Sequence, residues 1–211
     1  MRTLVLVHGW GFDAGFWQPV AQRLPDFERV FVDLGFRGEA RIPDSLDQPL
    51  VVGHSMGFPW ALAHLPRPWA GAMAINSFAR FLRAPDFVAG VPPVKLQRMI
   101  DKFGTEPHAV TADFLSRIGV EAPEVEDIRP EPLARALDWL AACDQRAALA
   151  GLDCPLQAVA GTHDQLVPEA MSRVSFPPQA LVLAEGGGHL LPQTHPEWVA
   201  SRIRLFAASL R

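Results

Sequence analysis

LVVGHSMG, residues 50–57, is the stretch from which the rest of the chain is interpreted. Its aliphatic start predicts a buried strand, and the segment after it, residues 58–65, suits a helix. The G-x-S-x-G pattern between them is typical of a sharp turn that holds its serine, Ser55, in a strained backbone conformation. Gly53 and Gly57 are small where the chain must pass close to itself. We therefore expect the Ser55 hydroxyl to be presented at the carboxyl end of a strand.

Five further apolar runs predict the other strands of the same sheet: residues 3–7, 29–32, 71–75, 155–160 and 180–183. Runs that are apolar without alternation are typical of strands buried on both faces, as in a parallel sheet covered by helices. Helical periodicity appears between them, for example in residues 16–24 and 196–210, and residues 39–48 leave room for a turn or two of helix. The pattern predicts a doubly wound α/β fold with a six-stranded, all-parallel sheet.

The pattern changes between the fourth and fifth predicted strands. Prolines interrupt residues 78–149, no clear buried strand occurs there, and helical periodicity is found in 94–103, 110–118 and 132–149. We predict a helical lid inserted at 78–149 into a core formed by residues 1–77 and 150–211.

Polar residues follow four of the predicted strands. Ser55 follows the third strand, Asp164 the fifth and His189 the sixth, while the turn HGWG, residues 8–11, follows the first. The carboxyl ends of parallel strands share one edge of the sheet, where ligands bind. A serine hydroxyl needs a base to attack, a histidine can supply it near neutral pH, and a carboxylate can orient that histidine. These three residue types therefore predict acyl transfer.

The motifs together resemble the α/β-hydrolase family from Val5 to Phe206. They are HGWG (8–11), DLGFRG (33–38), GHSMG (53–57), GTHDQLVP (161–168) and GGGHLLPQTHPE (186–197). The resemblance implies that Ser55 is the nucleophile, His189 the general base and then acid, and Asp164 the carboxylate that orients His189. It also implies that the backbone N–H groups of Trp10 and Met56 form the oxyanion hole.

The chain departs from the usual pattern of that family at its first strand and in one connection. The first predicted strand begins at residue 3, so we expect a sheet without the usual preceding strands and with the order 2-1-3-4-5-6. The stretch between Asp33 and Ser55 is short, which predicts a thinly covered flank of the sheet. An apolar surface exposed there makes a homodimer the alternative to a monomer.

No carboxylate follows the fourth strand, where Asn76 stands. Asp138 and Asp144 are rival acids, although both lie in helical patterns within the predicted lid.

We expect the lid to select the substrate, together with three large apolar residues near the mouth of the site: Trp10, Phe12 and Phe78. Packing in the hydrophobic core is an equally good interpretation of these three side chains. Within the family, LVHGWGFDA (6–14), NSFARF (76–81) and DWLAACDQR (138–146) are similar to pimeloyl-[acyl-carrier protein] methyl ester esterases. That resemblance implies an ester on an acyl carrier protein. Arg98 and Lys102 would then present a basic surface to the acidic carrier, and a solvated helix surface is the competing interpretation.

Composition excludes several other classes of protein. A net charge of -4 argues against nucleic acid as a partner. No apolar run approaches the roughly 18 residues that span a bilayer, and no leader pattern is present, so we expect a cytoplasmic protein without a membrane segment. No spacing suggests a metal site, and no cofactor is expected.

Two functions remain open. The first is a serine carboxylesterase, with thioesterase or lactonase activity as variants, and the second is a ligand-binding or signalling protein of the same fold with little turnover.

Overall fold

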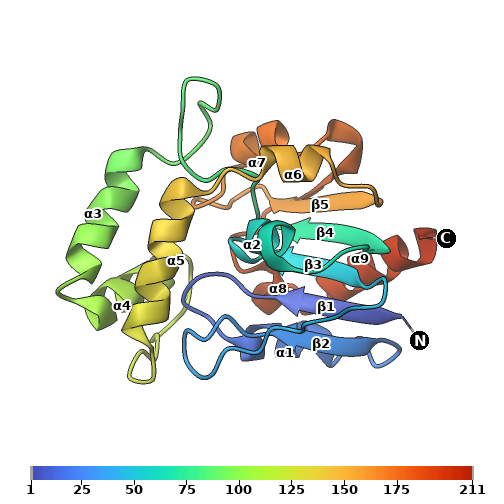
Figure 1. The fold of residues 1–211 in the computed structure, drawn as a ribbon, viewed down its shortest axis with the longest axis horizontal. Helices are drawn as coiled ribbons and strands as arrows, with labels where there is room; N and C mark the ends of the chain where they lie inside the picture. The colour runs from blue at the N-terminus through green and yellow to red at the C-terminus, as the bar shows by residue number, and fades with distance from the viewer. Residues whose placement is uncertain (1, 211) are drawn as a thin grey trace.

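The computed structural model describes residues 2–210, and six parallel strands form its central sheet (Figure 1). The strands are β1 (Thr3–Val7), β2 (Glu28–Val32), β3 (Leu50–His54), β4 (Gly71–Ile75), β5 (Leu156–Gly161) and β6 (Leu181–Ala184). Their order is β2-β1-β3-β4-β5-β6, with parallel pairing throughout. The predicted six-stranded parallel sheet and its order are confirmed.

Helices cover both faces of the sheet, as a doubly wound fold requires. On one face, Leu4, Leu6 and Val52 pack against the 3-10 turn η1 (Ala14–Trp17), α1 (Gln18–Ala21), α8 (Leu191–Thr194) and α9 (Pro196–Ser209). On the other face, Val5 and Val51 pack against α2 (Gly57–His64), α6 (Arg146–Ala150) and Phe176, which follows α7 (Glu169–Ser175). A short turn, η2 (Pro178–Ala180), precedes β6. The strand side chains from Leu4 to Val7 are fully buried, which explains their unbroken apolar sequence.

The pairing register brings the carboxyl ends of the strands level with one another. Val7 at the end of β1 pairs with Gly53 of β3, and His54 at the end of β3 pairs with Ile75 of β4. Gly161 at the end of β5 pairs with Ala184 of β6. The polar residues that follow these strands therefore start from the same edge of the sheet.

Three helices stand beyond that edge and form a layer of their own, at the left of Figure 1. They are α3 (Pro93–Phe103), α4 (Pro107–Arg117) and α5 (Pro130–Ala142). Their buried side chains, including Leu96, Phe103 and Leu137, share one apolar cluster with Trp10 and Met56 of the core. The role of this layer as a lid, and the boundaries at 78 and 149, stay predictions.

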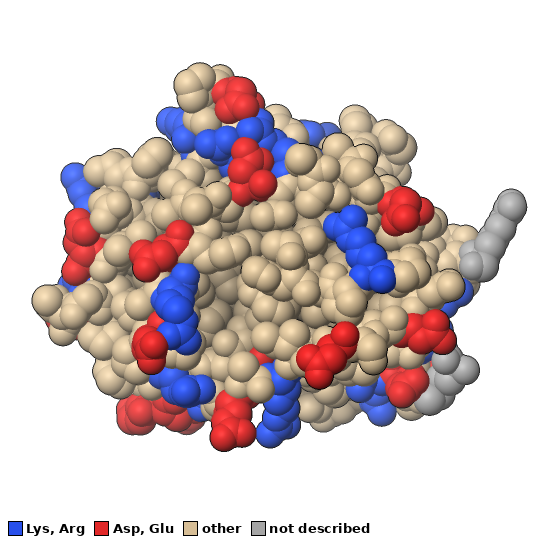
Figure 2. Space-filling view, viewed as in Figure 1, with Lys and Arg blue, Asp and Glu red and all other residues tan. Residues whose placement is uncertain are grey.

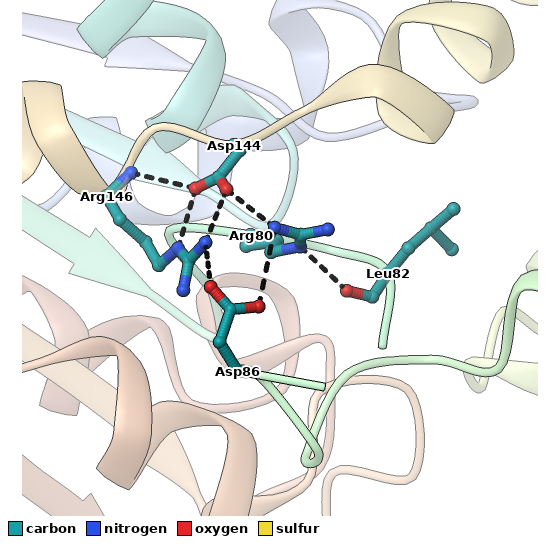
Figure 3. Close-up of polar contacts among 5 residues, drawn as sticks. All are labelled: Arg80, Leu82, Asp86, Asp144 and Arg146. Atoms are coloured by element: carbon teal, nitrogen blue, oxygen red, sulfur yellow. Dashed lines mark hydrogen bonds and ion pairs between the residues drawn. The ribbon is translucent and has the colours of Figure 1, made fainter. Parts of the chain in front are cut away.

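The chain segments that enter and leave this layer are held together by charged side chains (Figure 3). Arg80 and Asp144 form an isolated antiparallel bridge, and Arg80 Nη1 donates to Asp144 Oδ2 at 2.7 Å. Arg146 Nη2 contacts both Asp144 Oδ2 at 2.7 Å and Asp86 Oδ2 at 2.8 Å. Asp144 thus pairs with two arginines, Arg80 and Arg146. These ion pairs explain the presence of this carboxylate without a catalytic role.

One local prediction was wrong. The single helix expected over 132–149 is two helices, because the chain extends at Cys143 and pairs with Arg80 before α6 begins at Arg146. Residues 39–48 form no helix, as their shortness allows, and Arg41 pairs with Asp33 across an antiparallel bridge. At Cys143 a contact between segments distant in sequence decides the backbone, and local periodicity does not report such contacts.

The connection from β2 to β3 forms no helix, as expected, but the flank beside it is not broadly apolar. The side chains of β1 from Leu4 onward are buried, and Leu46 of the connecting segment packs against the cluster on the α2 face. Ile42, at 46% exposure, is the large apolar side chain left open in that segment. The homodimer stays a prediction. Within residues 2–210, none of the helices combines the length and the apolar character needed to cross a membrane.

Candidate active site

Ser55 lies in the tight turn between β3 and α2. Its φ is +53°, in the left-handed region that a residue with a side chain rarely occupies. The turn is held from β4 and the residues after it, because Ser55 N donates to Ile75 O at 3.0 Å and Ser77 Oγ donates to Ser55 O at 2.6 Å. These bonds stabilise a strained conformation, which is the expected geometry of a nucleophile elbow.

The two glycines of the turn are required by close backbone contacts. A Cβ on Gly53 would lie 2.5 Å from Phe58 N, and a Cβ on Gly57 would lie 2.5 Å from Val7 O. Both neighbours are main-chain atoms, so the overlap has no side chain that can rotate away. The pattern G-x-S-x-G is therefore explained by packing at both ends of the elbow.

Replacing Gly53 by alanine is expected to lower the free energy of unfolding by about 3 kcal/mol. This is the upper end of the cost of adding atoms to a well-packed interior. Chemical denaturation would measure the change in the free energy of unfolding. Gly38→Ala is the matched control, since a Cβ there has no atom within 4 Å, and we expect it to change stability by less than about 1 kcal/mol. Equal stability of both variants would contradict this account of the elbow.

Asp164 and His189 form a buried pair at the ends of β5 and β6. His189 Nδ1 lies 2.7 Å from Asp164 Oδ2, and the two residues are 5% and 4% exposed. The other oxygen, Asp164 Oδ1, accepts from the backbone N–H groups of Leu166 and Val167, each at 2.9 Å. Burial raises the pKa of Asp164, but the His189 charge and hydrogen bonds from His189, Asn76 and Val167 outweigh it and lower that pKa. Asp164 is therefore an ionised acceptor that orients the imidazole of His189.

His54, the residue before Ser55, contacts His189 directly. Its Nε2 lies 2.9 Å from His189 O, and the centroids of the two rings are 4.8 Å apart. Burial, followed by the positive charge of His189, lowers the pKa of His54 to about 3, so this ring is neutral. A carbonyl only accepts hydrogen bonds, so Nε2 carries the proton of His54. The contact places His189 beside the residue that immediately precedes Ser55.

The HGWG turn passes close to Ser55. A Cβ on Gly9 would lie 3.1 Å from Ser55 Cβ and 3.1 Å from His54 Nδ1, so a side chain there would crowd both residues. Trp10 follows directly, and Met56 immediately precedes α2. The structure thus brings both residues beside Ser55, and the role of their N–H groups as an oxyanion hole stays a prediction.

A comparison of the sequence with known families matches residues 4–202 to the alpha/beta hydrolase family. The chain belongs to this family. Solved structures agree on the fold of this hydrolase: an esterase from Thermogutta terrifontis superposes with a TM-score of 0.75 at 24% identity over 100% of this chain and 90% of that one. A bromoperoxidase from Bacillus anthracis superposes with a TM-score of 0.85 at 16% identity, over 99% and 92% of the two chains.

Curated relatives of the hydrolase include pimeloyl-[acyl-carrier protein] methyl ester esterases. The protein from Xanthomonas oryzae pv. oryzae is 31% identical over 249 aligned residues, which cover 99% of this chain and 96% of that protein. The one from Stenotrophomonas maltophilia is 32% identical, with 98% and 93% covered. The biotin biosynthesis bifunctional protein BioHC of Cellvibrio japonicus is 29% identical over 99% of this chain, which spans 48% of that protein's length.

The hydrolase buries most of the side chains that were expected to select the substrate. Trp10 is 3% exposed, donates from Nε1 to Leu133 O at 3.0 Å, and packs edge-on against Phe114. Phe78 is fully buried in the same cluster, whereas Phe12 is partly buried on the opposite side, against Phe16. Substrate contact by Trp10, Phe12 and Phe78 stays a prediction, while packing is their observed role.

The basic surface of the hydrolase is smaller than its sequence suggests. Arg80 is paired with Asp144, and Lys102 Nζ lies 3.5 Å from Glu106 Oε2. Lys95 and Arg98 are exposed on α3, and among the residues described neither takes part in a salt bridge. Figure 2 shows basic and acidic side chains interspersed over the visible face, so electrostatic attraction of a partner would be local.

Sequence reasoning missed two polar residues of this hydrolase, Asn76 and Ser77. Ser77 supports the elbow through Ser55 O, as described above. Asn76 Nδ2 donates to Asp164 Oδ2 at 2.7 Å and to Gly188 O at 3.0 Å. Their position directly after β4 was the available signal, since every other residue of the site also follows a strand.

Proposed function

We propose that this protein is a serine hydrolase that cleaves carboxylic esters through an acyl-enzyme on Ser55. One observation carries the proposal: a buried Asp164–His189 pair lies at the same sheet edge as a serine held at a φ of +53°. The family and the esterases among its relatives support the same reaction class. The acid, base and nucleophile come from three different strand ends, which is the usual arrangement of this catalytic machinery.

In the first half of the reaction, Ser55 Oγ attacks the ester carbonyl and His189 Nε2 takes its proton. Asp164 keeps the other proton on Nδ1, so that Nε2 is free to act as the base, and it stabilises the imidazolium that forms. The carbonyl oxygen becomes negatively charged and would be held by the N–H groups of Trp10 and Met56. His189 then protonates the leaving alkoxide, and the alcohol departs from the acyl-enzyme.

In the second half, water replaces the alcohol. His189 removes a proton from the water as it attacks the acyl carbonyl, and the resulting intermediate breaks its bond to Ser55 Oγ. His189 returns the proton to Ser55, and the carboxylic acid leaves. One water is consumed for each ester cleaved, and no redox step or metal ion is required.

For the substrate, we propose the methyl ester of a pimeloyl group carried by an acyl carrier protein. The names of relatives that align with nearly the whole chain support this choice. Lys95 and Arg98 are exposed on α3 outside any salt bridge of the described residues, and Lys102 beside them is shared with Glu106, so α3 supplies a local surface of the sign that an acidic carrier needs. Thioesters and lactones are alternatives that a substrate screen would separate, because the same serine chemistry applies to them.

Charge reversal on α3 tests the carrier. Arg98→Glu/Lys102→Glu is expected to raise KM for a carrier-bound methyl ester roughly tenfold at low salt, with less effect at high salt, since exposed charges act mainly on encounter. Hydrolysis of p-nitrophenyl butyrate should be unchanged. Arg173→Glu on α7 is the control for a surface charge elsewhere. Unchanged kinetics on the carrier-bound ester at low salt would exclude docking through α3.

A further inference from the structure

Asn76 occupies a backbone position that few residue types tolerate. It follows β4 directly, is completely buried, and has a φ of +48°. Asparagine is among the few non-glycine residues that adopt left-handed backbone conformations readily. Its own N–H donates to Val159 O at 2.8 Å, which extends the pairing of β4 with β5. The backbone of Asn76 is therefore fixed relative to the strand that precedes Asp164.

The side chain of Asn76 connects the acid to the loop of the base. Its Nδ2 faces two acceptors, Asp164 Oδ2 and Gly188 O, at 2.7 and 3.0 Å. This assigns the orientation of the amide, because the reverse orientation would set an oxygen against a carboxylate and a carbonyl. Asp164 Oδ2 is also the oxygen that binds His189 Nδ1, and Gly188 immediately precedes His189. One amide group thus contacts both sides of the Asp164–His189 pair.

We propose that Asn76 is a positioning residue for catalysis, which holds the Asp164 carboxylate and the Gly188–His189 backbone in the geometry that the base requires. The inference rests on the proposed hydrolytic function. It assigns to Asn76 no contact with the substrate. Asn76 acts through Asp164 and His189. The hydrogen bond between these two residues keeps the proton of the imidazole on His189 Nδ1.

The charged and titratable groups around this amide are few. Asp164 bonds it directly, His189 binds the same carboxylate oxygen, and His54 faces His189 from the end of β3. His54 is neutral for the reason given above. His8 is also buried, and its Nε2 lies 3.7 Å from Asp33 Oδ1. A new acid at position 76 would therefore meet one carboxylate, Asp164, at hydrogen-bond distance.

Asn76→Asp is the first variant, because aspartate also tolerates a positive φ. Two carboxyl groups this close cannot both ionise readily, so the pair is expected to keep one proton near neutral pH. In that state the new acid can donate to Asp164 Oδ2 as the amide did. As pH rises and the pair loses this proton, the two charges repel and the geometry is lost. We expect a falling limb of kcat between about pH 6 and 9 that the wild type lacks.

Asn76→Gly is the second variant, because it keeps the positive φ accessible and removes the amide. We expect kcat to fall roughly ten- to a hundredfold with KM little changed, the size of effect that misplacement of a catalytic group produces. The downfield proton resonance of His189 Nδ1–H should shift or broaden in this variant. Ala122→Gly, at an exposed residue with a φ of +45°, is the control for the backbone change and should leave activity unaltered.

The outcomes separate this inference from the proposed function. A wild-type pH profile in Asn76→Asp, or a wild-type kcat in Asn76→Gly, would overturn the positioning role while Ser55→Ala stays inactive. Unfolding of both variants in circular dichroism would also overturn it, because Asn76 would then serve stability alone. Full hydrolysis by Ser55→Ala would instead overturn the proposed function.

Discussion

Ester hydrolysis by Ser55→Ala is expected to be slower than by the wild type by roughly 10⁵-fold or more in kcat, the loss typical of removing a serine nucleophile. The variant lacks the oxygen to which the acyl group is transferred, and the remaining histidine can only act on water. The assay is hydrolysis of p-nitrophenyl butyrate at saturating substrate. Folding should be preserved, because alanine and serine meet the same steric constraint at a φ of +53°.

Ser172→Ala is the matched control for this substitution. Ser172 is also buried, and its Oγ has no hydrogen-bond partner among the described residues, so removal of this hydroxyl should not reduce activity or stability. A Ser55→Ala protein that keeps a tenth or more of the wild-type kcat would contradict the assignment of the nucleophile.

Asp164→Asn is expected to lower kcat by about 10⁴-fold through the wrong tautomer of His189. The N–H groups of Leu166 and Val167 require an oxygen at the Oδ1 position. The new NH₂ group must therefore replace Oδ2, where it faces His189 Nδ1 and Asn76 Nδ2. His189 can accept this bond only by moving its proton to Nε2, and it then has no lone pair with which to accept the proton of Ser55.

The same geometry predicts a loss of stability in Asp164→Asn, because two NH₂ groups meet where one donor and one acceptor stood. The buried donor left unpaired should reduce the free energy of unfolding by about 1–3 kcal/mol. Asp138→Asn is the control, since Asp138 is the exposed rival acid on α5. Equal kcat values for the wild type and Asp164→Asn would show that another group orients the base.

Much of the fold follows from short-range patterns in the sequence. The unbroken apolar runs of β1 and β3 predict strands buried on both faces, and helices between them require a parallel sheet. The break at Cys143 was not predictable in this way, because it depends on the pairing of Asp144 with Arg80, 64 residues earlier. Contacts that distant in sequence leave no periodicity in either segment.

In the candidate site, too, some residues could be predicted from local sequence and others depend on contacts between distant segments. Ser55, Asp164 and His189 could be predicted because each stands after an apolar strand and carries a side chain with recognisable chemistry. Asn76 could not, since an amide neither titrates nor attacks, and its partner Asp164 is 88 residues away. The sequence left a core position and a substrate contact equally open for Trp10, because the helices that enclose it come from residues 93–142. The supporting residues of a site are visible only once the chain is folded.

Covalent labelling of the folded protein with a fluorophosphonate tests the central claim most directly. Such a probe reacts with an activated serine and stays bound, so intact mass and peptide mapping report both stoichiometry and position. We expect one adduct per chain, on Ser55, with no adduct on Ser55→Ala and much slower labelling of Asp164→Asn. Failure to label the folded wild type, or an adduct on another serine such as Ser77, would contradict the account.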